Sequence, residues 1–574
     1  MATLARSRTG APRPTPTATG MIRDLQGLED REFDLVVVGG GIYGVCAAWD
    51  AALRGLSVAL LERGDFGHAT SANSLKLVHG GFRYLQHADV PRIRHSVHER
   101  RVLMCIAPHL VHPLPFLVPA YGHGLRGKEI LTVALSLYNL IAFDRNRGVT
   151  DSQRRIPFGE LLSPARCLEL FPELEARALT GGVVFYDGQM HAPPRLLLAY
   201  LRSAVEAGAR AANYAEVTGL LRQGDRVVGV RVKDLAGGDT LRIRGKVVLN
   251  AAGPWVPDLL ARVPGSRPKA PLRFSKDLYL VVRRRFSPRY ALAVPSHERD
   301  PNALVSRGTR HLFLIPWRGH TLIGSSHVAY RGSADDFTVT EQDIEGFLAE
   351  VNRGYPGARL GRDEVTFVYS GLVPMEGDAA GSFGLKLARR HQIIDHERAD
   401  GVPGLISVAG VRFTTSRIVA EHAVDLVLRK LGRPARNSST ASTPLAGGTI
   451  EDFDAFLRTH ARERPDGMSE AVMSHLLHCY GTLHAEVLRL IEHDARLNET
   501  LGDSDVLKAE VVHAVRSEMA QTLSDVVFRR TDLATAGHPG EPALTACAAL
   551  LGEELGWDET RVARELDHVR SAFP

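Results

Sequence analysis

The sequence has few cysteines, no long apolar run and little excess charge, and each shortage excludes a class of protein. Its 5 cysteines in 574 residues are widely separated and form no CxxC pair, which argues against a disulfide framework and a zinc or iron–sulfur site. No apolar stretch reaches the roughly 20 residues that cross a bilayer. The net charge is only +5, and no run of Lys or Arg offers a footprint for nucleic acid. We therefore expect a cytoplasmic protein with no metal and no nucleic-acid partner.

Composition divides the chain into a tail, a large core and a smaller helical part. Apolar residues make up 44% and charged residues 24%, as in folded globular proteins. Residues 1–30 lack the apolar core of a secretory signal and are expected to form a flexible tail. Residues 435–448, rich in Ser, Thr and Pro, are predicted to be a linker. Helical periodicity then predicts a separate helical domain over residues 449–574.

The segment from Phe33 to Glu62 has the pattern of a dinucleotide-binding unit. An apolar strand runs into the GxGxxG glycines Gly39, Gly41 and Gly44, and an Ala-rich helix and a second strand follow. The first glycine permits a tight turn, the second lets backbone approach a pyrophosphate, and the third lets helix and strand pack closely. The helix N-terminus offers N–H groups to phosphates, and Glu62 is placed to bind ribose hydroxyls. A Rossmann-like domain is therefore predicted.

Two later segments are predicted to approach the same cofactor. A strand at 246–249 runs into NAAGPW, whose small residues Ala252 and Gly253 let the backbone pass beside a bound cofactor. A strand at 404–409 is followed by Gly410 and a helix, a geometry that points N–H groups at the anionic edge of a reduced flavin.

The remaining strands predict a second domain inserted into the first. Apolar runs at 278–282, 311–316 and 321–324 indicate a mixed or antiparallel sheet on the substrate side. The expected fold class is thus an α/β core over residues 31–434, followed by the helical domain. Its cofactor-binding segments lie near 33–90, 190–260 and 400–432, and its substrate-side segments near 91–189 and 261–399.

Together these motifs resemble the FAD-dependent glycerol-3-phosphate dehydrogenase and oxidase family. The most specific is TSANSLKLVHGGFRYL at Thr70–Leu85, which is similar to that family's TSxxSSKLIHGGLRYL segment. The likeness continues through NAAGPW, IPWR at 315–318, YSG at 369–371, Gly410–Arg417 and DVVFRRTD at 525–532. The resemblance implies FAD as the cofactor, a flavin oxidoreductase core with a helical C-terminal domain, and electrons passed to a quinone or to oxygen.

The resemblance also implies the residues of the site. Beside the glycine motif and Glu62, it assigns FAD binding to Thr70, Ser71, Ser74, Lys76, His79, Gly80, Gly81, Ala252, Gly253, Gly410, Arg412, Thr414 and Thr415. Oxidising a secondary alcohol needs hydride transfer to flavin N5, a group that accepts the hydroxyl proton, and cations that hold an anionic substrate. His79 can be the base or a flavin-side partner, and Arg83 can pair bidentately with phosphate.

Three departures from the family's pattern bear on the substrate. Val373 stands where SGVRPL has arginine, Arg412 where GGKLTTYR has lysine, and Tyr279 where KGSH has histidine. A phosphate-binding cation is therefore missing unless another replaces it. The catalytic candidates are His79, Arg83, Tyr279 and Arg412, and the candidate substrate anchors are Arg83, Arg318, Arg412 and Lys386.

The expected activity is oxidation of sn-glycerol 3-phosphate to dihydroxyacetone phosphate, with electrons passed to a quinone or another acceptor. Two alternatives stay open: oxidation of a different hydroxy acid, alcohol or amino acid, and a flavin-binding protein without catalysis. Peripheral contact with the inner face of a membrane also stays open, because basic residues flank the apolar segment 130–143.

Two clusters in the helical part receive structural interpretations. His475, His478 and His484 are expected on a surface helix, because no pattern of metal-binding carboxylates lies beside them. Arg529 and Arg530 are expected to pair with acidic neighbours rather than with lipid.

Overall fold

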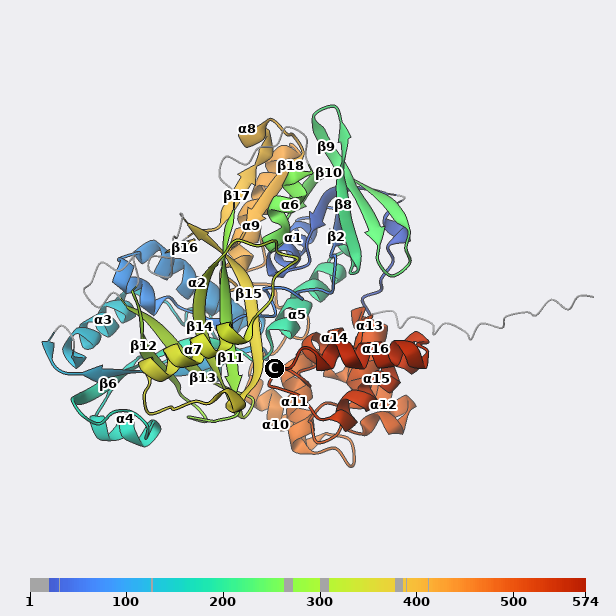
Figure 1. The fold of residues 1–574 in the computed structure, drawn as a ribbon. Helices are drawn as coiled ribbons and strands as arrows, with labels where there is room; N and C mark the ends of the chain where they lie inside the picture. Colours follow the sequence, from blue (N-terminus) through green and yellow to red (C-terminus); the bar gives the residue numbers. More distant parts are fainter. Residues whose placement is uncertain are drawn as a thin grey trace, which may run out of the picture.

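The chain forms two interleaved sheets with a helical domain beside them (Figure 1). The structure, a computed structural model, describes residues 20–29, 31–124, 127–262, 272–299, 309–376, 386–388, 390–410 and 412–574. Within these residues, no helix combines the length and the apolar character needed to cross a membrane.

The first sheet is built around β1 (Glu32–Val38), a strand buried from Phe33 to Val38. β1 pairs in parallel with β10 on one side and with β2 on the other. The strand order is β17 (Gln392–Asp395), β18 (Leu405–Ala409), β10 (Thr240–Asn250), β1, β2 (Val58–Leu61) and β7 (Arg210–Ala212), and the antiparallel strands β8 (Ala215–Gln223) and β9 (Arg226–Asp234) extend from β10.

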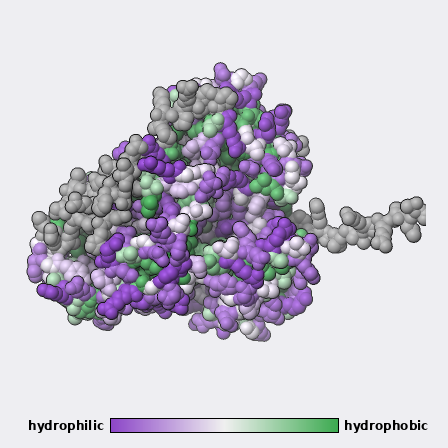
Figure 2. Space-filling view, viewed as in Figure 1, coloured by the Kyte–Doolittle hydropathy of each residue, from purple (hydrophilic) through white to green (hydrophobic). Residues whose placement is uncertain are grey.

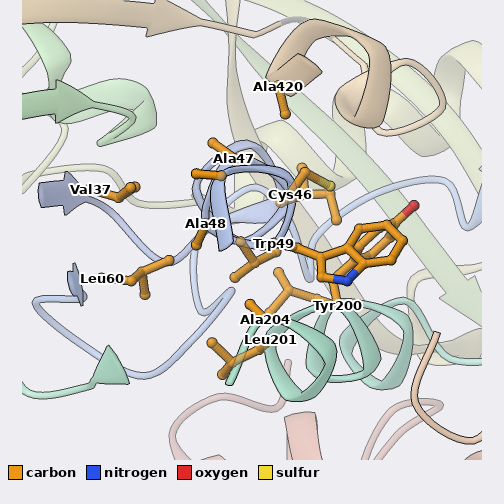
Figure 3. Packing of buried hydrophobic residues seen from close by; sticks show 14 of the residues in the cluster. Val37, Cys46, Ala47, Ala48, Trp49, Leu60, Tyr200, Leu201, Ala204 and Ala420 are labelled. Carbon is orange, nitrogen blue, oxygen red and sulfur yellow. The ribbon is translucent and has the colours of Figure 1, made fainter. Parts of the chain in front are cut away.

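Helices cover one face of this sheet, and the β8–β9 hairpin and a short helix cover the other. On the first face Val37 packs with α1 (Ile42–Leu53), α5 (Pro193–Glu206) and α9 (Ser416–Lys430). Figure 3 shows Trp49 of α1 meeting Tyr200 of α5, with ring centroids 5.4 Å apart in an edge-to-face arrangement. On the second face Val36 and Val38 pack against the hairpin and α6 (Val256–Ala261). Burial on both faces explains the continuous apolar run from Leu35 to Val38 of β1.

The second sheet is largely antiparallel. Its order is β16 (Lys386–Leu387), β15 (Val365–Glu376), β11 (Arg273–Val282), β14 (His320–Tyr330), β13 (Thr309–Trp317), β12 (Ala291–Arg299), β4 (Val111–Tyr121), β6 (Leu179–Met190) and β3 (Leu77–Val78), with β5 (Glu160–Leu162) beside β6. The helices that accompany the core are α2 (Val90–Ile106), α3 (Lys128–Ile141), α4 (Pro164–Leu170), α7 (Glu341–Gly354) and α8 (His396–Asp400). The predicted fold class of a Rossmann-like domain with an inserted sheet domain is confirmed.

The C-terminal part is helical, as predicted, and has its own apolar clusters. It contains α10 (Phe453–Arg462), α11 (Glu470–Tyr480), α12 (His484–His493), α13 (Lys508–Glu518), α14 (Leu523–Asp525), the π-helical turn η9 (Val526–Arg530), α15 (Glu541–Leu555) and α16 (Glu559–Arg570). On the face seen in Figure 2, hydrophilic side chains cover most of this part. Residues 435–448, predicted as a linker, lie outside any helix or strand.

Part of the segment expected to form a flexible tail is packed against the rest of the chain. Residues 1–19 and 30 lie outside the described residues, but residues 20–29 are packed. Met21 is buried, its N–H donates to the carbonyl of Ser517, and Arg23 pairs with Asp234 at 2.5 Å. The expectation is therefore wrong for residues 20–29, because the apolar side chains of Met21, Leu25 and Leu28 pack into the hydrophobic core.

A buried carboxylate ties the C-terminal domain to the first sheet. Asp65, four residues beyond the end of β2, contacts Arg529 at 2.6 Å and Arg530 at 2.6 Å. The side chains of Asp65 and Arg530 are fully buried, and Asn213 donates to the same carboxylate at 3.1 Å. The expectation that both arginines pair with acidic residues is confirmed, and Asp525 is the second partner of Arg529. These cations hold the pKa of Asp65 well below its usual value despite burial.

We expect Asp65→Asn to destabilise the protein by about 3 to 5 kcal/mol, because it leaves the buried Arg530 without its counter-charge. The lowered pKa means that Asp65 stabilises the fold above the carboxylate's ordinary pKa of about 4 and loses this effect as pH falls through its folded value. Urea unfolding of the full chain, followed by circular dichroism between neutral and acid pH, measures both effects. The matched control is Glu541→Gln, which removes the exposed partner of Arg570 and should leave the urea midpoint in place. An unchanged midpoint for Asp65→Asn would contradict the assignment.

Candidate functional site

A cavity of about 760 Å³ lies between the two sheets. Gly39, Ala251 and Gly410 follow the carboxyl ends of β1, β10 and β18 and form one wall, and Tyr279 of β11 lies on the substrate-side wall. Ligands of open parallel sheets bind outside the carboxyl ends of the strands, so the cavity lies where the sequence predicts the cofactor.

The glycine motif has the geometry that each position was predicted to need. Gly39 has a φ of +105°, and a Cβ there would lie 2.6 Å from the carbonyl oxygen of Ala251. At Gly44 a Cβ would lie 1.9 Å from the carbonyl oxygen of Gly39, so only glycine lets α1 pack this closely. At Gly41 the one neighbour within 4 Å would be Ser71 Oγ, so backbone there is open to the cavity.

Glu62 and Ser71 shape the turn around α1. The Glu62 carboxylate accepts hydrogen bonds from the N–H groups of Gly40 at 2.6 Å and Gly64 at 2.8 Å, and it lines the cavity. Ser71 Oγ accepts from the N–H of Ile42 at 3.0 Å, and Thr70 donates to the carbonyl of Leu372 on β15 at 3.1 Å. The Thr70–Ser74 segment therefore bridges the two sheets.

The segment before α9 is held against α1. A Cβ on Gly410 would lie 1.9 Å from the Tyr43 ring. The Tyr43 hydroxyl donates to the Arg412 carbonyl at 2.7 Å and lies 3.0 Å from the Arg412 N–H. The Thr414 hydroxyl accepts from the His79 N–H at 3.2 Å. The predicted segments around 79 and 410 are thus brought together.

Asp187 fixes the His79-Gly80-Gly81 turn. Its carboxylate accepts from the Gly80 N–H at 2.5 Å and from Arg100 at 2.6 Å. A Cβ on Gly80 would lie 2.2 Å from the Tyr138 hydroxyl of α3, and Gly81 has a φ of +83°. This packing leaves the His79 ring on the cavity wall.

Three arginines gather around His79 on this wall. Arg83, Arg92 and Arg412 all line the cavity. The guanidinium groups of Arg92 and Arg412 lie 3.8 and 5.1 Å from the Tyr84 ring centroid, and the Tyr84 hydroxyl lies 3.3 Å from His79 Nε2. Burial, together with the charges of Arg412, Arg92 and Arg83, holds the pKa of His79 well below its usual value. This environment disfavours the charged form of His79.

Sequence reasoning missed Arg92. It lies in the first turn of α2, where its N–H donates to the N-cap Asp89 at 3.2 Å. Burial and the charges of Arg412 and Arg83 lower its pKa, and its Nε is buried with no hydrogen-bond partner among the described residues. The available signal was a helix start, Asp-Val-Pro-Arg, soon after the HGGFRYL segment.

The structure brings most predicted residues to the cavity. Those on its wall are Gly39, Gly41, Glu62, Thr70, Ser71, Ser74, His79, Gly81, Arg83, Ala252, Gly253, Tyr279, Gly410, Arg412 and Thr414, and Val373 lies there too. Gly44, Gly80 and Thr415 are not among the residues that line the cavity. The side chain of Lys386 and residue 411 lie outside the described residues.

Lys76 and Arg318 are not brought to this cavity. The buried Lys76 ammonium donates to the carbonyl of Ala72 at 2.6 Å and lies 3.4 Å from the Tyr369 ring centroid. Arg318 ion-pairs with Asp532 of the C-terminal domain and donates to the carbonyl of His191 at 2.9 Å. The prediction of Arg318 as a substrate anchor is therefore not supported, because a buried carboxylate 214 positions away in the sequence holds it.

The histidines of α11 and α12 differ from expectation as well. His475 and His484 are buried, and His475 lies 3.1 Å from Glu510. Nearby, His191, Cys479 and Asp532 bring three potential ligand atoms within 4.8 Å of one another. Because the Arg318 guanidinium contacts Asp532, a cation already faces this carboxylate, and we assign no metal here.

The cavity fits FAD by an observation independent of any motif. Because Gly41 has no side chain, the backbone at the N-terminus of α1 is exposed to the cavity, and a larger residue there would project into it. The Glu62 carboxylate on the same wall suits ribose hydroxyls. Gly41, Glu62, Ser71 and the Gly410–Thr414 segment would hold the dinucleotide.

Comparison with known proteins agrees with this geometry. The family described as FAD dependent oxidoreductase matches residues 34–426, and the C-terminal domain of alpha-glycerophosphate oxidase matches residues 438–562. The glycerol-3-phosphate dehydrogenase of Synechocystis sp. is 34% identical over 95% of this chain and 97% of its own. The human mitochondrial glycerol-3-phosphate dehydrogenase is 31% identical over 97% of this chain and 75% of its own.

Solved structures include a similar protein with its cofactor. The glycerol-3-phosphate dehydrogenase from Bacillus halodurans complexed with FAD superimposes with a TM-score of 0.74 and 27% identity, over 96% of each chain. The overall fold, with its two sheets and helical C-terminal domain, is thus shared with this relative. The chain belongs to the FAD-dependent oxidoreductase family and carries the C-terminal domain found in alpha-glycerophosphate oxidase.

Proposed function

We propose that this chain is an FAD-dependent dehydrogenase that oxidises sn-glycerol 3-phosphate to dihydroxyacetone phosphate. The observation that carries the proposal is the cluster of Arg83, Arg92 and Arg412 beside His79 on the cavity wall. Arginine presents a planar fork of donors that matches phosphate oxygens. The names of the relatives, glycerol-3-phosphate dehydrogenases, support the same substrate.

Arg92 supplies the cation that Val373 lacks. Val373 and Arg92 line the same cavity from different elements, β15 and α2. Because burial and the charges of Arg412 and Arg83 lower the pKa of Arg92, the cluster favours an anionic ligand that would neutralise it. This argues against neutral alcohols as substrates and favours a phosphate monoester, whose dianion can engage more than one arginine.

The residues on the cavity wall have different roles in the proposed reaction. The arginines hold the phosphate and thereby orient the rest of the substrate. His79 is uncharged and can hydrogen-bond the substrate or the cofactor without adding to the positive charge. FAD, when bound, supplies the hydride acceptor. The apolar wall of the cavity excludes water from the reacting carbon.

A second part of the proposal concerns the electron acceptor. We infer that an apolar face of α3, together with Phe158 and Leu161, contacts the surface of a membrane peripherally, on its inner face, and that electrons pass to a quinone. Val133, Leu137 and Leu140 lie along one side of α3 and are 61%, 47% and 71% exposed, and Phe143 beyond its end is 75% exposed. In Figure 1, α3 lies on the side of the molecule away from the C-terminal helices. The free state of all five cysteines supports a reducing compartment.

An aromatic wall connects this face with the cavity. Leu131 and Ala134 of α3 line the cavity itself. Phe82 stacks on Phe185 with ring centroids 4.5 Å apart, and Phe116 continues the stack at 5.1 Å. An apolar quinone arriving at α3 would thus meet an apolar lining on the way to the cofactor.

Anaerobic reduction of the flavin by glycerol 3-phosphate tests the substrate and the role of Arg92. We expect saturable bleaching of the wild-type flavin and an apparent Kd about 10 to 100 times higher for Arg92→Met, because a charge-assisted hydrogen bond contributes about 1.5 to 3 kcal/mol. The control is Arg94→Met on the same helix, since Arg94 pairs with Asp144 instead. Absence of bleaching would exclude the substrate, and an equal Kd in the two variants would exclude Arg92 as an anchor.

Sedimentation with vesicles of anionic phospholipid tests the apolar face of α3. We expect the wild-type protein to sediment with the vesicles and Leu140→Glu/Phe143→Glu to stay largely in solution, because charges resist insertion among acyl chains. Leu235→Glu is the matched control, since Leu235 is also exposed, at 44%, but lies at the distant β9–β10 turn. Equal sedimentation of all three proteins would contradict membrane contact through α3.

A further inference from the structure

A hydrogen-bonded chain of serine, histidine and aspartate lines the cavity on the substrate-side sheet. Asp277 of β11 and His327 of β14 are opposed in the strand pair, and His327 Nδ1 lies 2.8 Å from Asp277 Oδ1. His327 Nε2 lies 2.9 Å from Ser325 Oγ. All three residues lie on the cavity wall, so the chain of hydrogen bonds runs from the cavity into the sheet.

Asp277 sets the direction of these hydrogen bonds. Its carboxylate is 3% exposed and accepts from Ser275 Oγ at 2.7 Å. Because an ionised carboxylate can only accept, His327 Nδ1 carries the ring proton and Nε2 is left as the acceptor. The Ser325 hydroxyl therefore donates to Nε2.

The carboxylate of Asp277 favours binding of a proton at His327 Nε2. Among the described residues, His327 is the one ion-pairing partner of Asp277. When the ring of His327 gains a proton, it forms an ion pair with the buried carboxylate of Asp277. The aspartate of a catalytic triad stabilises an imidazolium in the same way.

His79 lies in the opposite environment. Burial and the charges of Arg412, Arg92, Arg83 and Arg100 all disfavour the imidazolium form. A group in this position binds the substrate well but accepts a proton poorly. The cavity therefore holds two histidines, of which one faces cations and the other faces a carboxylate.

We propose that His327 is the proton acceptor in substrate oxidation, that Ser325 relays the proton to it, and that Asp277 is its positioning residue. The inference rests on the proposed function. The substrate O–H bond breaks, its electron pair forms the new C=O bond, and the proton passes to Ser325 Oγ while the serine proton moves to His327 Nε2. The carbon gives up its hydrogen with the electron pair to FAD, the oxidant of the proposed function.

The rate of anaerobic flavin reduction at saturating glycerol 3-phosphate tests the assignment. We expect His327→Gln to slow reduction about 10² to 10⁴-fold with little change in apparent Kd, since general-base catalysis contributes that range. Ser325→Ala should slow it by a smaller factor. Ser326→Ala is the matched control, because Ser326 is the next residue of β14 but does not line the cavity.

Chemical rescue separates chemistry from damage to the fold. His327→Ala should regain part of the reduction rate when imidazole is added, whereas a variant that has only lost packing would not respond. Both His327 variants should keep a full complement of FAD. A rate for His327→Gln equal to that of the wild type, or a slow His327→Ala that imidazole does not accelerate, would overturn the assignment.

The outcomes also separate this inference from the proposed function. If glycerol 3-phosphate reduces the wild-type flavin and His79→Gln is slow while His327→Gln is fast, the proton acceptor is His79 and this inference alone fails. If the wild-type flavin is not reduced at all, the proposed function fails, and this inference fails with it.

Discussion

The architecture depends on one buried charge, the carboxylate of Asp65. Two arginines of η9 surround it, and a third neighbour, Asn213, belongs to the segment after β7. A buried carboxylate is costly unless it is paired, so Asp65 and the C-terminal domain require each other. Asp65 follows Glu62 by three positions. The C-terminal helical domain, although it does not line the cavity, therefore contacts the loop that carries Glu62 to the cavity wall.

Charge also distinguishes two parts of the cavity wall. Cations cluster where α2 and the segment before α9 meet the His79 turn, and an isolated carboxylate lies behind His327 on β11 and β14. An anion is attracted to the first end, while a proton is attracted to the second. A substrate with a phosphate at one end and a hydroxyl near the other suits this arrangement, because its two reacting parts prefer opposite surroundings.

Local patterns predicted the fold well and the partners of long side chains poorly. The GxGxxG unit was predictable because a buried parallel strand and close helix packing leave few residue types at Gly39 and Gly44. Arg318 was misplaced because its motif, IPWR, says nothing of Asp532 in another domain, and His475 because its partner Glu510 lies on another helix. Arg92 was not predicted for a related reason. A single arginine at the start of a helix produces no periodic pattern in the sequence, and only the fold shows that it lies beside Arg83 and Arg412 on the cavity wall.

The strand order of the first sheet has a consequence for synthesis of the chain. β1 lies between β2, which follows it closely, and β10, which ends at residue 250, and β18 completes the parallel set only at residue 409. During translation one edge of this buried strand therefore lacks its neighbour while some 200 residues emerge, a state that exposes backbone and apolar surface to other chains. Asp65 remains without its partner for longer still, because Arg530 lies 465 residues further along the chain, and an unpaired carboxylate is costly to bury.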